Sequence, residues 1–269
     1  MANSKSGVAN IQTLFSNANA EGNLSSAAQS ILSIPDIAAQ INAAMGVPAV
    51  DVHSSEVFVC TLLVDDSGSI AGAGNEQLIR DGVNLVRSAL IKSDARKSIL
   101  MCVRYLNGQV VIPFTPIEQV PLLDSNNYRA NGGTPLYDMT VVALGDVLAK
   151  TQEFSDRGVP VRSATMIVTD GHDEHSHRIR RPEEIVDIMR DVLQSETHIV
   201  SGMGIQDNVG TDFRDIFKRM GIQDKWILTP AATEHDIRLC WGTFSQTAAR
   251  GSQGAAAYSQ TQLGGFGQP

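Results

Sequence analysis

The chain has 269 residues, of which 42% are hydrophobic and 19% are charged. These values are ordinary for a folded protein and exclude disorder of the chain as a whole, and the length allows one large domain with appendages. The formal net charge of −8 argues against nucleic acid and anionic membranes as partners, because both are bound through clusters of Lys and Arg.

Neither a secretion signal nor a membrane span is expected. The first residues lack the continuous apolar core of a signal peptide, and no segment approaches the roughly 20 apolar residues that cross a bilayer. The three cysteines have no CxxC-like spacing, so we expect free buried thiols and no disulfide or zinc site. These features predict a cytoplasmic protein.

Residues 1–50 form an N-terminal arm that is rich in Ala, Ser, Asn and Gly. The arm contains one expected helical stretch, from Ser25 to Met45, which Pro35 should break or kink. Apolar residues of this stretch could form a stripe that packs on the domain or on another subunit. They are Ile31, Leu32, Ile37, Ile41 and Met45.

Strands and helices alternate along the next part of the chain. The run VFVCTLLV, residues 57–64, is continuous and apolar, as in a strand that is covered on both faces, and apolar residues recur at helical spacing over residues 75–92. Two further apolar runs, residues 98–106 and 109–114, flank Asn107-Gly108. This pattern predicts a hairpin with a type I′ turn, and therefore one antiparallel edge strand.

The alternation continues beyond the hairpin. A helix is expected from Leu136, with Pro135 in its first turn. The remaining expected elements are a strand at 164–169, a helix at 183–194, a strand at 198–205, a helix at 213–220, a strand at 226–228 and a helix at 234–249. Strands separated by helices predict an α/β fold, with a mostly parallel sheet and helices on both faces. We place one domain at residues 55–250 and a flexible Gly/Gln-rich tail at 251–269.

Three polar clusters lie at or beside the ends of predicted strands, where parallel sheets collect functional loops. Hydroxyl and carboxylate oxygens are suitable ligands for a hard cation such as Mg²⁺, and Gly68 offers backbone freedom to the first cluster. We predict a site for one divalent cation, Mg²⁺ with Mn²⁺ or Ca²⁺ as substitutes. The five predicted metal-site residues are Asp65, Ser67, Ser69, Thr134 and Asp170.

The motifs around these residues resemble those of von Willebrand factor A-type (vWA) domains. D-x-S-x-S occurs at residues 65–69, G-G-T-P-L contains Thr134 and T-D-G contains Asp170, in the same order as in the family. The resemblance covers about residues 55–250 and implies a Rossmann-like fold with a metal-ion-dependent adhesion site (MIDAS). In such a site the two serines and, in one state, the threonine ligate the metal directly, while the two aspartates act largely through water.

The resemblance also implies protein binding without catalysis. A metal held largely by neutral hydroxyls stays electrophilic, and in the family the completing ligand is typically an Asp or Glu of a partner protein. Many intracellular bacterial members work beside AAA+ ATPases or in stress systems such as tellurite resistance. Such a system is therefore one candidate setting for this chain, by analogy alone.

The loop after Asp170 is rich in His and Arg and should lie next to the metal. Four of its residues could form a rim that attracts an acidic partner, although a solvated loop explains the same charges. They are His172, Arg178, Arg180 and Arg181. The histidines at 172, 175 and 177 suggest, as an alternative, a second site for a transition metal.

Two other functions are alternatives to metal-dependent binding. In an aspartate-nucleophile phosphohydrolase Asp65 would be the nucleophile, but Ser67 stands where such enzymes carry a second, acid/base Asp. In a structural role, the arm and the tail would join identical subunits by self-association. That role is compatible with metal-dependent binding.

Overall fold

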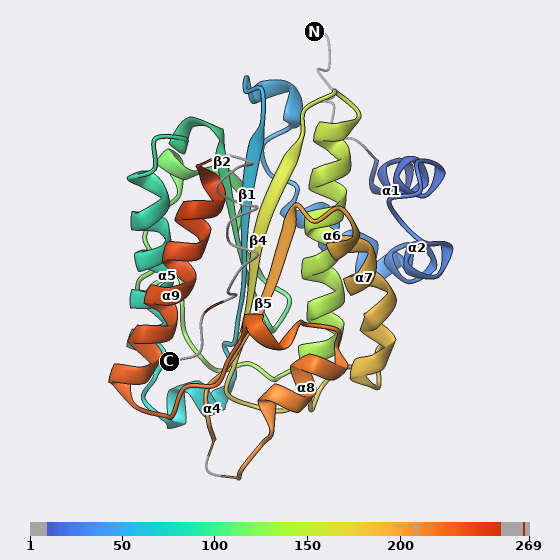
Figure 1. Cartoon of the computed structure of the whole chain (residues 1–269). Helices are drawn as coiled ribbons and strands as arrows, with labels where there is room; N and C mark the ends of the chain where they lie inside the picture. Colours follow the sequence, from blue (N-terminus) through green and yellow to red (C-terminus); the bar gives the residue numbers. More distant parts are fainter. Residues whose placement is uncertain (1–9, 208, 254–265, 267–269) are drawn as a thin grey trace, which may run out of the picture.

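The computed structural model describes residues 10–207, 209–253 and 266. Within these residues the chain forms a six-stranded sheet in the order β3-β2-β1-β4-β5-β6, which lies between two layers of helices (Figure 1). The strands are β1 (Val57–Val64), β2 (Ile99–Tyr105), β3 (Val110–Pro116), β4 (Val161–Thr169), β5 (His198–Gly204) and β6 (Ile227–Leu228). Neighbouring strands are parallel except β2 and β3, which are antiparallel. The predicted fold class is confirmed.

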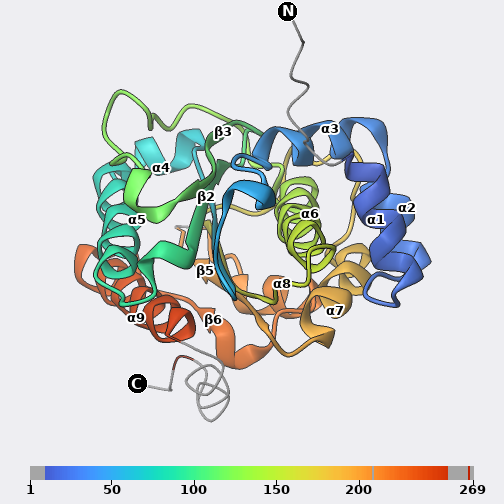
Figure 2. The same cartoon turned by 90° about the horizontal axis from the view of Figure 1, so that it is seen from above.

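Helices cover both faces of the sheet. Viewed from above, α5 and α9 lie on one side, and α6, α7 and the N-terminal helices lie on the other (Figure 2). The helices are α1 (Ile11–Ala20), α2 (Ser26–Leu32), α3 (Pro35–Ala44), α4 (Gly68–Gly72), α5 (Glu76–Ile91), α6 (Leu136–Ser155), α7 (Val186–Gln194), α8 (Phe213–Arg219) and α9 (Glu234–Ser252). In the described part of the chain, no helix has the length and hydropathy of a membrane span.

The central strand β1 determines where the functional loops leave the sheet. All of its residues are buried, and it pairs with β2 on one side and with β4 on the other. Its last residue, Val64, lies opposite Tyr105 of β2 and Val168 of β4. The segments that follow the three strands therefore begin at the same edge of the sheet.

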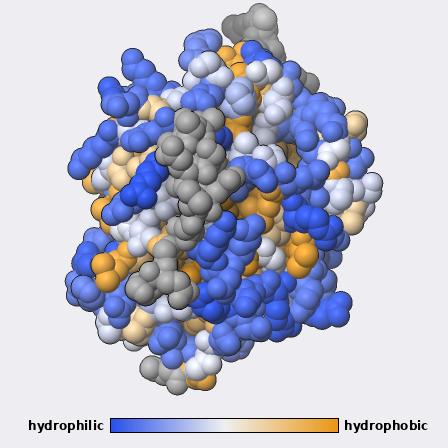
Figure 3. All heavy atoms as spheres, viewed as in Figure 1, coloured by the Kyte–Doolittle hydropathy of each residue, from blue (hydrophilic) through white to orange (hydrophobic). Residues whose placement is uncertain are grey.

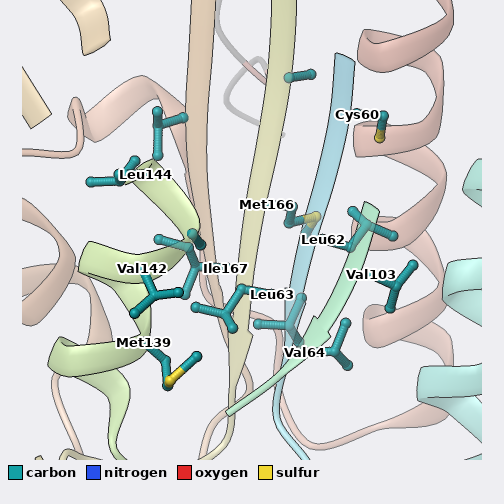
Figure 4. Packing of buried hydrophobic residues seen from close by; sticks show 14 of the residues in the cluster. Cys60, Leu62, Leu63, Val64, Val103, Met139, Val142, Leu144, Met166 and Ile167 are labelled. Atoms are coloured by element: carbon teal, nitrogen blue, oxygen red, sulfur yellow. The ribbon is translucent and has the colours of Figure 1, made fainter. Parts of the chain in front are cut away.

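The hydrophobic core fills both sides of the central strands. Successive residues of a strand point to opposite faces, so neighbours in β1 belong to different layers. Leu63 and Ile167 lie on the side of α6, near Val142, whereas Leu62 lies on the other side (Figure 4). Burial on both faces is why β1 is a continuous apolar run and does not alternate with polar residues.

The hairpin between β2 and β3 forms as predicted, but its turn is of another kind. A type I′ turn needs positive φ at both central residues, and only Gly108 has one, at 94°. Gly108 N donates a hydrogen bond to the Tyr105 carbonyl at 3.1 Å. This bond closes a turn over residues 105–108, and Gly108, its last residue, has the left-handed φ. Asn107 N instead donates to Asp66 Oδ1 at 3.0 Å, so the turn is tied to the loop after β1.

The N-terminal arm packs on its own domain. The predicted helical stretch is interrupted before Pro35, the first residue of α3, as expected for proline. Leu32 and Ile41 are fully buried against α6, where a Cβ on Gly145 would lie 2.8 Å from Leu32 Cδ2 and 2.5 Å from Ile41 Cδ1. The expected apolar stripe therefore faces the domain, and Gly145 makes the close approach feasible.

Helices α1 and α4 have no counterpart among the predicted elements. Helix α1 begins after Asn10, whose Oδ1 accepts a hydrogen bond from Gln12 N at 2.9 Å, and it buries Leu14 and Phe15. It also packs against α6. The boundaries proposed for the arm, the domain and the tail stay predictions, and most of the tail, 254–265 and 267–269, lies outside the described residues.

Buried cations fasten the end of the arm to the domain. The Lys150 ammonium on α6 donates to the carbonyls of Met45 and Val47, at 2.7 and 2.6 Å, and to Glu153 Oε2 at 2.7 Å. Arg104 on β2 pairs with Asp146 at 2.9 Å and also donates to the arm. A buried cation that loses its partners is costly, so these contacts fix the path of the chain between α3 and β1.

We expect Lys150→Met to destabilise the protein by about 3–5 kcal/mol, because it leaves the Glu153 carboxylate and two carbonyls without their buried donor. Urea unfolding measures this change. The control is Lys97→Met at an exposed lysine, which should change the free energy of unfolding by less than about 0.5 kcal/mol. Equal free energies of unfolding for the two variants would show that the buried contacts of Lys150 do not stabilise the protein.

Candidate metal centre

The first cluster lies between β1 and the short helix α4. Ser67 occupies the N-cap position of α4, but its side chain makes no capping hydrogen bond. Its hydroxyl lies 2.8 Å from the hydroxyl of Ser69 instead. The hydroxyl of Ser67 is therefore not used to cap the helix, although serine is a common N-cap residue.

Three oxygen atoms from two loops form a continuous row. Ser67 Oγ and Ser69 Oγ are 2.8 Å apart, and Ser69 Oγ donates to Asp170 Oδ1 at 2.6 Å. Neighbouring ligands of an octahedral Mg²⁺ with metal–oxygen distances of 2.0 to 2.1 Å lie about 2.9 Å apart. The two serines therefore already stand at nearly the spacing that such a cation requires.

Asp65 organises the ends of β1 and β4. Its carboxylate is fully buried, with Oδ1 accepting from Ser67 N at 2.8 Å and Oδ2 accepting from Thr169 Oγ1 at 2.7 Å. Burial raises the pKa of Asp65, and these hydrogen bonds oppose the rise. Because both oxygens accept hydrogen bonds from the protein, Asp65 is suited to orienting the loop that carries the serines.

Thr134 lies beside the other four residues. A Cβ on Gly171 would lie 3.7 Å from Thr134 Oγ1 and 4.0 Å from Ser69 Oγ. Within the described residues the Thr134 hydroxyl makes no hydrogen bond to the row of oxygens, whereas its backbone N donates to His175 Nδ1 at 3.1 Å. The structure thus brings all five predicted residues to one edge of the sheet.

The sequence suggested a role for Gly68 at this centre, but the glycines that allow close packing here are Gly132 and Gly133. Gly68 has no left-handed φ, and a Cβ there would meet no atom within 4 Å. The prediction that the first cluster uses the backbone freedom of Gly68 was therefore wrong. The close approaches occur in the Thr134 loop. A Cβ on Gly132 would lie 3.0 Å from Asp66 Oδ2, and one on Gly133 would lie 2.8 Å from His175 Nδ1.

Backbone hydrogen bonds join the Thr134 loop to the first cluster. Gly132 N donates to the Asp66 carbonyl at 2.8 Å, and Gly68 N donates to the Gly132 carbonyl at 3.1 Å. This short parallel bridge runs between segments that are far apart in the sequence. It fixes the Thr134 loop beside the serines.

Three carboxyl groups at the centre have no basic partner among the described residues. Burial raises the pKa of Asp170 to about 6, and the charges of Asp65 and Asp207 contribute to this rise. Burial, together with the charge of Asp65, likewise raises the pKa of Asp66 to about 6. Among the described residues, no Lys or Arg forms an ion pair with Asp65, Asp66 or Asp170. Buried charges are normally paired or coordinate a metal, so the donor set fits a hard divalent cation.

Sequence reasoning missed several residues that build the centre. Asp66 holds the hairpin through Asn107 N, while its Oδ2 is buried with no hydrogen-bond partner. The Tyr128 hydroxyl donates to the Asp65 carbonyl at 2.6 Å, and Thr169 supports the Asp65 side chain. Asp66 and Thr169 are visible inside the two motifs, whereas nothing in the sequence marks Tyr128.

The loop after Asp170 is folded by carboxylates. Asp138 on α6 accepts hydrogen bonds from the backbone N of His177 at 2.7 Å and of Ile179 at 2.7 Å. Asp173 Oδ1 accepts from Tyr137 N at 3.0 Å. The loop is therefore fastened to the start of α6, directly after the Thr134 loop.

The predicted rim residues have local partners. Arg178 Nε lies 3.1 Å from Asp36 Oδ2 on α3, Arg181 Nε lies 3.3 Å from Glu184 Oε1 and Arg180 Nη1 donates to the Ser176 carbonyl at 3.2 Å. No hydrogen bond or ion pair joins these arginines to the five predicted metal-site residues within the described chain. His172 is exposed and lies 3.5 Å from Glu174. A rim that attracts an acidic partner stays a prediction.

The three histidines do not form a second metal site. His175 accepts a hydrogen bond from Thr134 N, and His172 lies beside a glutamate. Over residues 10–207, 209–253 and 266, no group of three His, Cys, Asp or Glu side chains is arranged to hold a metal. The predicted metal centre is not a group of this kind, because most of its donors are hydroxyls.

Comparisons with known proteins show the fold. No family model matches the sequence, and no curated protein matches it. Among solved structures, the chain is similar to the pilus adhesin SpaC from Lactobacillus rhamnosus GG, with a TM-score of 0.53 and 13% identity over 72% of this chain and 30% of the adhesin. At this identity the similarity supports a vWA-like fold and does not extend to function.

Two other solved structures show weaker similarity to the chain. Proximal thread matrix protein 1 from the mussel byssus gives a TM-score of 0.47 and 14% identity, over 73% of this chain and 47% of that protein. The manganese-loaded TRAP protein of Plasmodium vivax gives 0.43 and 17%, over 68% of this chain and 72% of that protein. The chain thus spans less than half the length of the adhesin and of the byssus protein.

Metal binding at this centre should weaken at low pH. The Asp170 carboxyl, with its pKa raised to about 6, is mostly ionised near pH 7 and mostly protonated near pH 5, so protons compete with the cation. We expect the apparent affinity for Mg²⁺, followed by calorimetry, to fall about tenfold between these two conditions. Asp170→Asn should bind Mg²⁺ weakly at both, whereas Asp94→Asn at an exposed site should behave like the unsubstituted protein. An affinity that is independent of pH would contradict this assignment.

Proposed function

We propose that this chain is a protein-binding module that captures an acidic side chain of a partner through a divalent cation, Mg²⁺ under physiological conditions. One observation carries the proposal. Ser67 Oγ and Ser69 Oγ stand at the spacing of metal ligands, beside the Asp170 carboxylate, which has no basic partner among the described residues. An adhesin is among the proteins of similar fold, which fits a binding role.

Each residue of the centre has a distinct part in this function. Ser67, Ser69 and Thr134 would hold the cation through neutral hydroxyls, and Asp65 and Asp170 would orient its waters. A cation bound in this way supplies an electrophilic position that accepts a carboxylate oxygen. Hydroxyl ligands neutralise little of its charge, which leaves it attractive to an acidic group of the partner.

The geometry favours binding over phosphoryl transfer. A nucleophilic Asp65 would need one oxygen free to attack, but both oxygens accept hydrogen bonds and the side chain is fully buried. The residue two positions later is Ser67, which cannot act as the acid/base carboxyl of such an enzyme. We therefore propose that the chain has no catalytic activity of its own.

Self-association through the arm is less favoured, because the arm uses its apolar side on its own domain. Leu14, Phe15, Leu32 and Ile41 are buried within the same chain and are not available to a second subunit. A bacterial stress or AAA+ ATPase setting belongs to the proposal through the sequence resemblance alone, and a cytoplasmic location stays a prediction from the sequence.

Chelation tests the function directly. The immobilised chain should retain a partner from a cell extract in Mg²⁺, release it in EDTA and recover it when Mg²⁺ or Mn²⁺ is restored. Ser69→Ala should lose the partner, because it removes a metal ligand, while Ser30→Ala on α2 serves as the matched control. The same preparation should not hydrolyse p-nitrophenyl phosphate with Mg²⁺. Retention that is insensitive to EDTA would overturn the binding mechanism, and hydrolysis that Ser69→Ala abolishes would favour the enzyme.

A further inference from the structure

The backbone of Thr134 is held by the loop that follows Asp170. Thr134 N donates to His175 Nδ1 at 3.1 Å, and the Thr134 carbonyl accepts from Glu174 N at 3.1 Å. The second of these hydrogen bonds joins two backbone atoms, whereas the first depends on a side chain. The position of Thr134 is therefore sensitive to the identity of residue 175.

The His175 ring reaches Thr134 N because Gly133 leaves room for it. A Cβ on Gly133 would lie 2.8 Å from His175 Nδ1, 2.9 Å from Cγ and 3.1 Å from Cε1. Three atoms of the ring thus occupy the space that a side chain at position 133 would need. Gly133 has no left-handed φ, so an alanine there would suit the backbone conformation but collide with the ring.

The loop is also fastened on both sides of His175 by contacts that do not involve the imidazole. Asp173 Oδ1 accepts from Tyr137 N at 3.0 Å, and Ser176 Oγ accepts from Asp138 N at 3.0 Å. Both donors lie in the first turn of α6. We therefore expect the loop to stay folded when the imidazole is removed.

The imidazole is exposed, whereas the group that it holds is buried. Of residues 172–178, all of which are described, only Ser176 is buried. Hydrophilic residues also cover most of the visible surface over α8, which contacts Pro182–Ile185 at the far end of the loop (Figure 3). Thr134, by contrast, is only 5% exposed. A buried backbone N–H needs an acceptor, and His175 Nδ1 supplies it.

We propose that His175 is a positioning residue of the metal centre, which holds Thr134 beside Ser67 and Ser69. The inference rests on the proposed function, because Thr134 is one of the residues that would hold the cation. Nδ1 of His175 already accepts from Thr134 N, so His175 acts on the centre without binding the cation through that atom.

The affinity for Mn²⁺, measured from the electron paramagnetic resonance signal of the free ion, tests this role. We expect His175→Ala to weaken binding about fivefold, the factor expected for one net hydrogen bond. His175→Asn should restore most of the affinity, because its Oδ1, like Nδ1 of histidine, is bonded to Cγ and can accept from Thr134 N. The matched control is His177→Ala in the same loop, since His177 contacts Asp138 through a backbone N that alanine retains.

A double-mutant cycle shows whether His175 acts through Thr134. Thr134→Val removes the hydroxyl but keeps the backbone N and nearly the same shape. In that background, His175→Ala should change the Mn²⁺ affinity by less than about twofold, because the hydroxyl that it positions is already absent. Gly133→Ala, which displaces the ring, should weaken binding as His175→Ala does. Urea unfolding should show that the His175 variants remain folded.

The outcomes separate this inference from the proposed function. If the unsubstituted chain binds no Mn²⁺, the proposed function fails and the inference fails with it. If the unsubstituted chain binds Mn²⁺ and His175→Ala binds it equally well or more tightly, the inference alone is wrong. It is also wrong if His175→Asn binds as weakly as His175→Ala, or if His175→Ala causes the same loss with and without the Thr134 hydroxyl.

Discussion

The buried carboxylate of Asp65 is the interaction on which the centre depends. It accepts hydrogen bonds from Ser67 N, two residues later in the D-x-S-x-S turn, and from Thr169 Oγ1 at the end of β4. One side chain thus joins two strand ends whose register already places them at the same level. The cost of burying this charge is offset only while these donors stay in place, so the position of the serines is coupled to the sheet.

Other contacts hold the neighbouring loops in place around the Asp65 carboxylate. The hairpin turn is held by Asp66, the Thr134 loop approaches through Gly132 and Gly133, and α6 carries Asp138, which folds the next loop. The opposite end of α6 fastens the N-terminal arm through Lys150. A single helix therefore connects the arm with the functional edge.

Most of the sheet was predictable because its strands are apolar runs and its helices have clear periodicity. The five predicted metal-site residues could be found because two of their motifs directly follow β1 and the end of β4, and the third directly precedes α6. Tyr128 was not predictable, because a tyrosine in a polar loop gives no sign that its hydroxyl reaches the Asp65 carbonyl. The turn at Asn107 differed since Asp66, 41 residues earlier, captures its backbone N. Contacts between residues far apart in the chain cannot be predicted from local sequence patterns.

We propose that Ser67, Ser69 and Thr134 surround one divalent cation. Anomalous diffraction from crystals grown with Mn²⁺ tests it most directly, because the signal locates the metal itself. We expect one strong peak within about 2.5 Å of both serine hydroxyls, a little beyond an ideal metal–oxygen distance. The absence of a peak there at saturating Mn²⁺, or a peak on the histidines of the loop after Asp170 in its place, would contradict it.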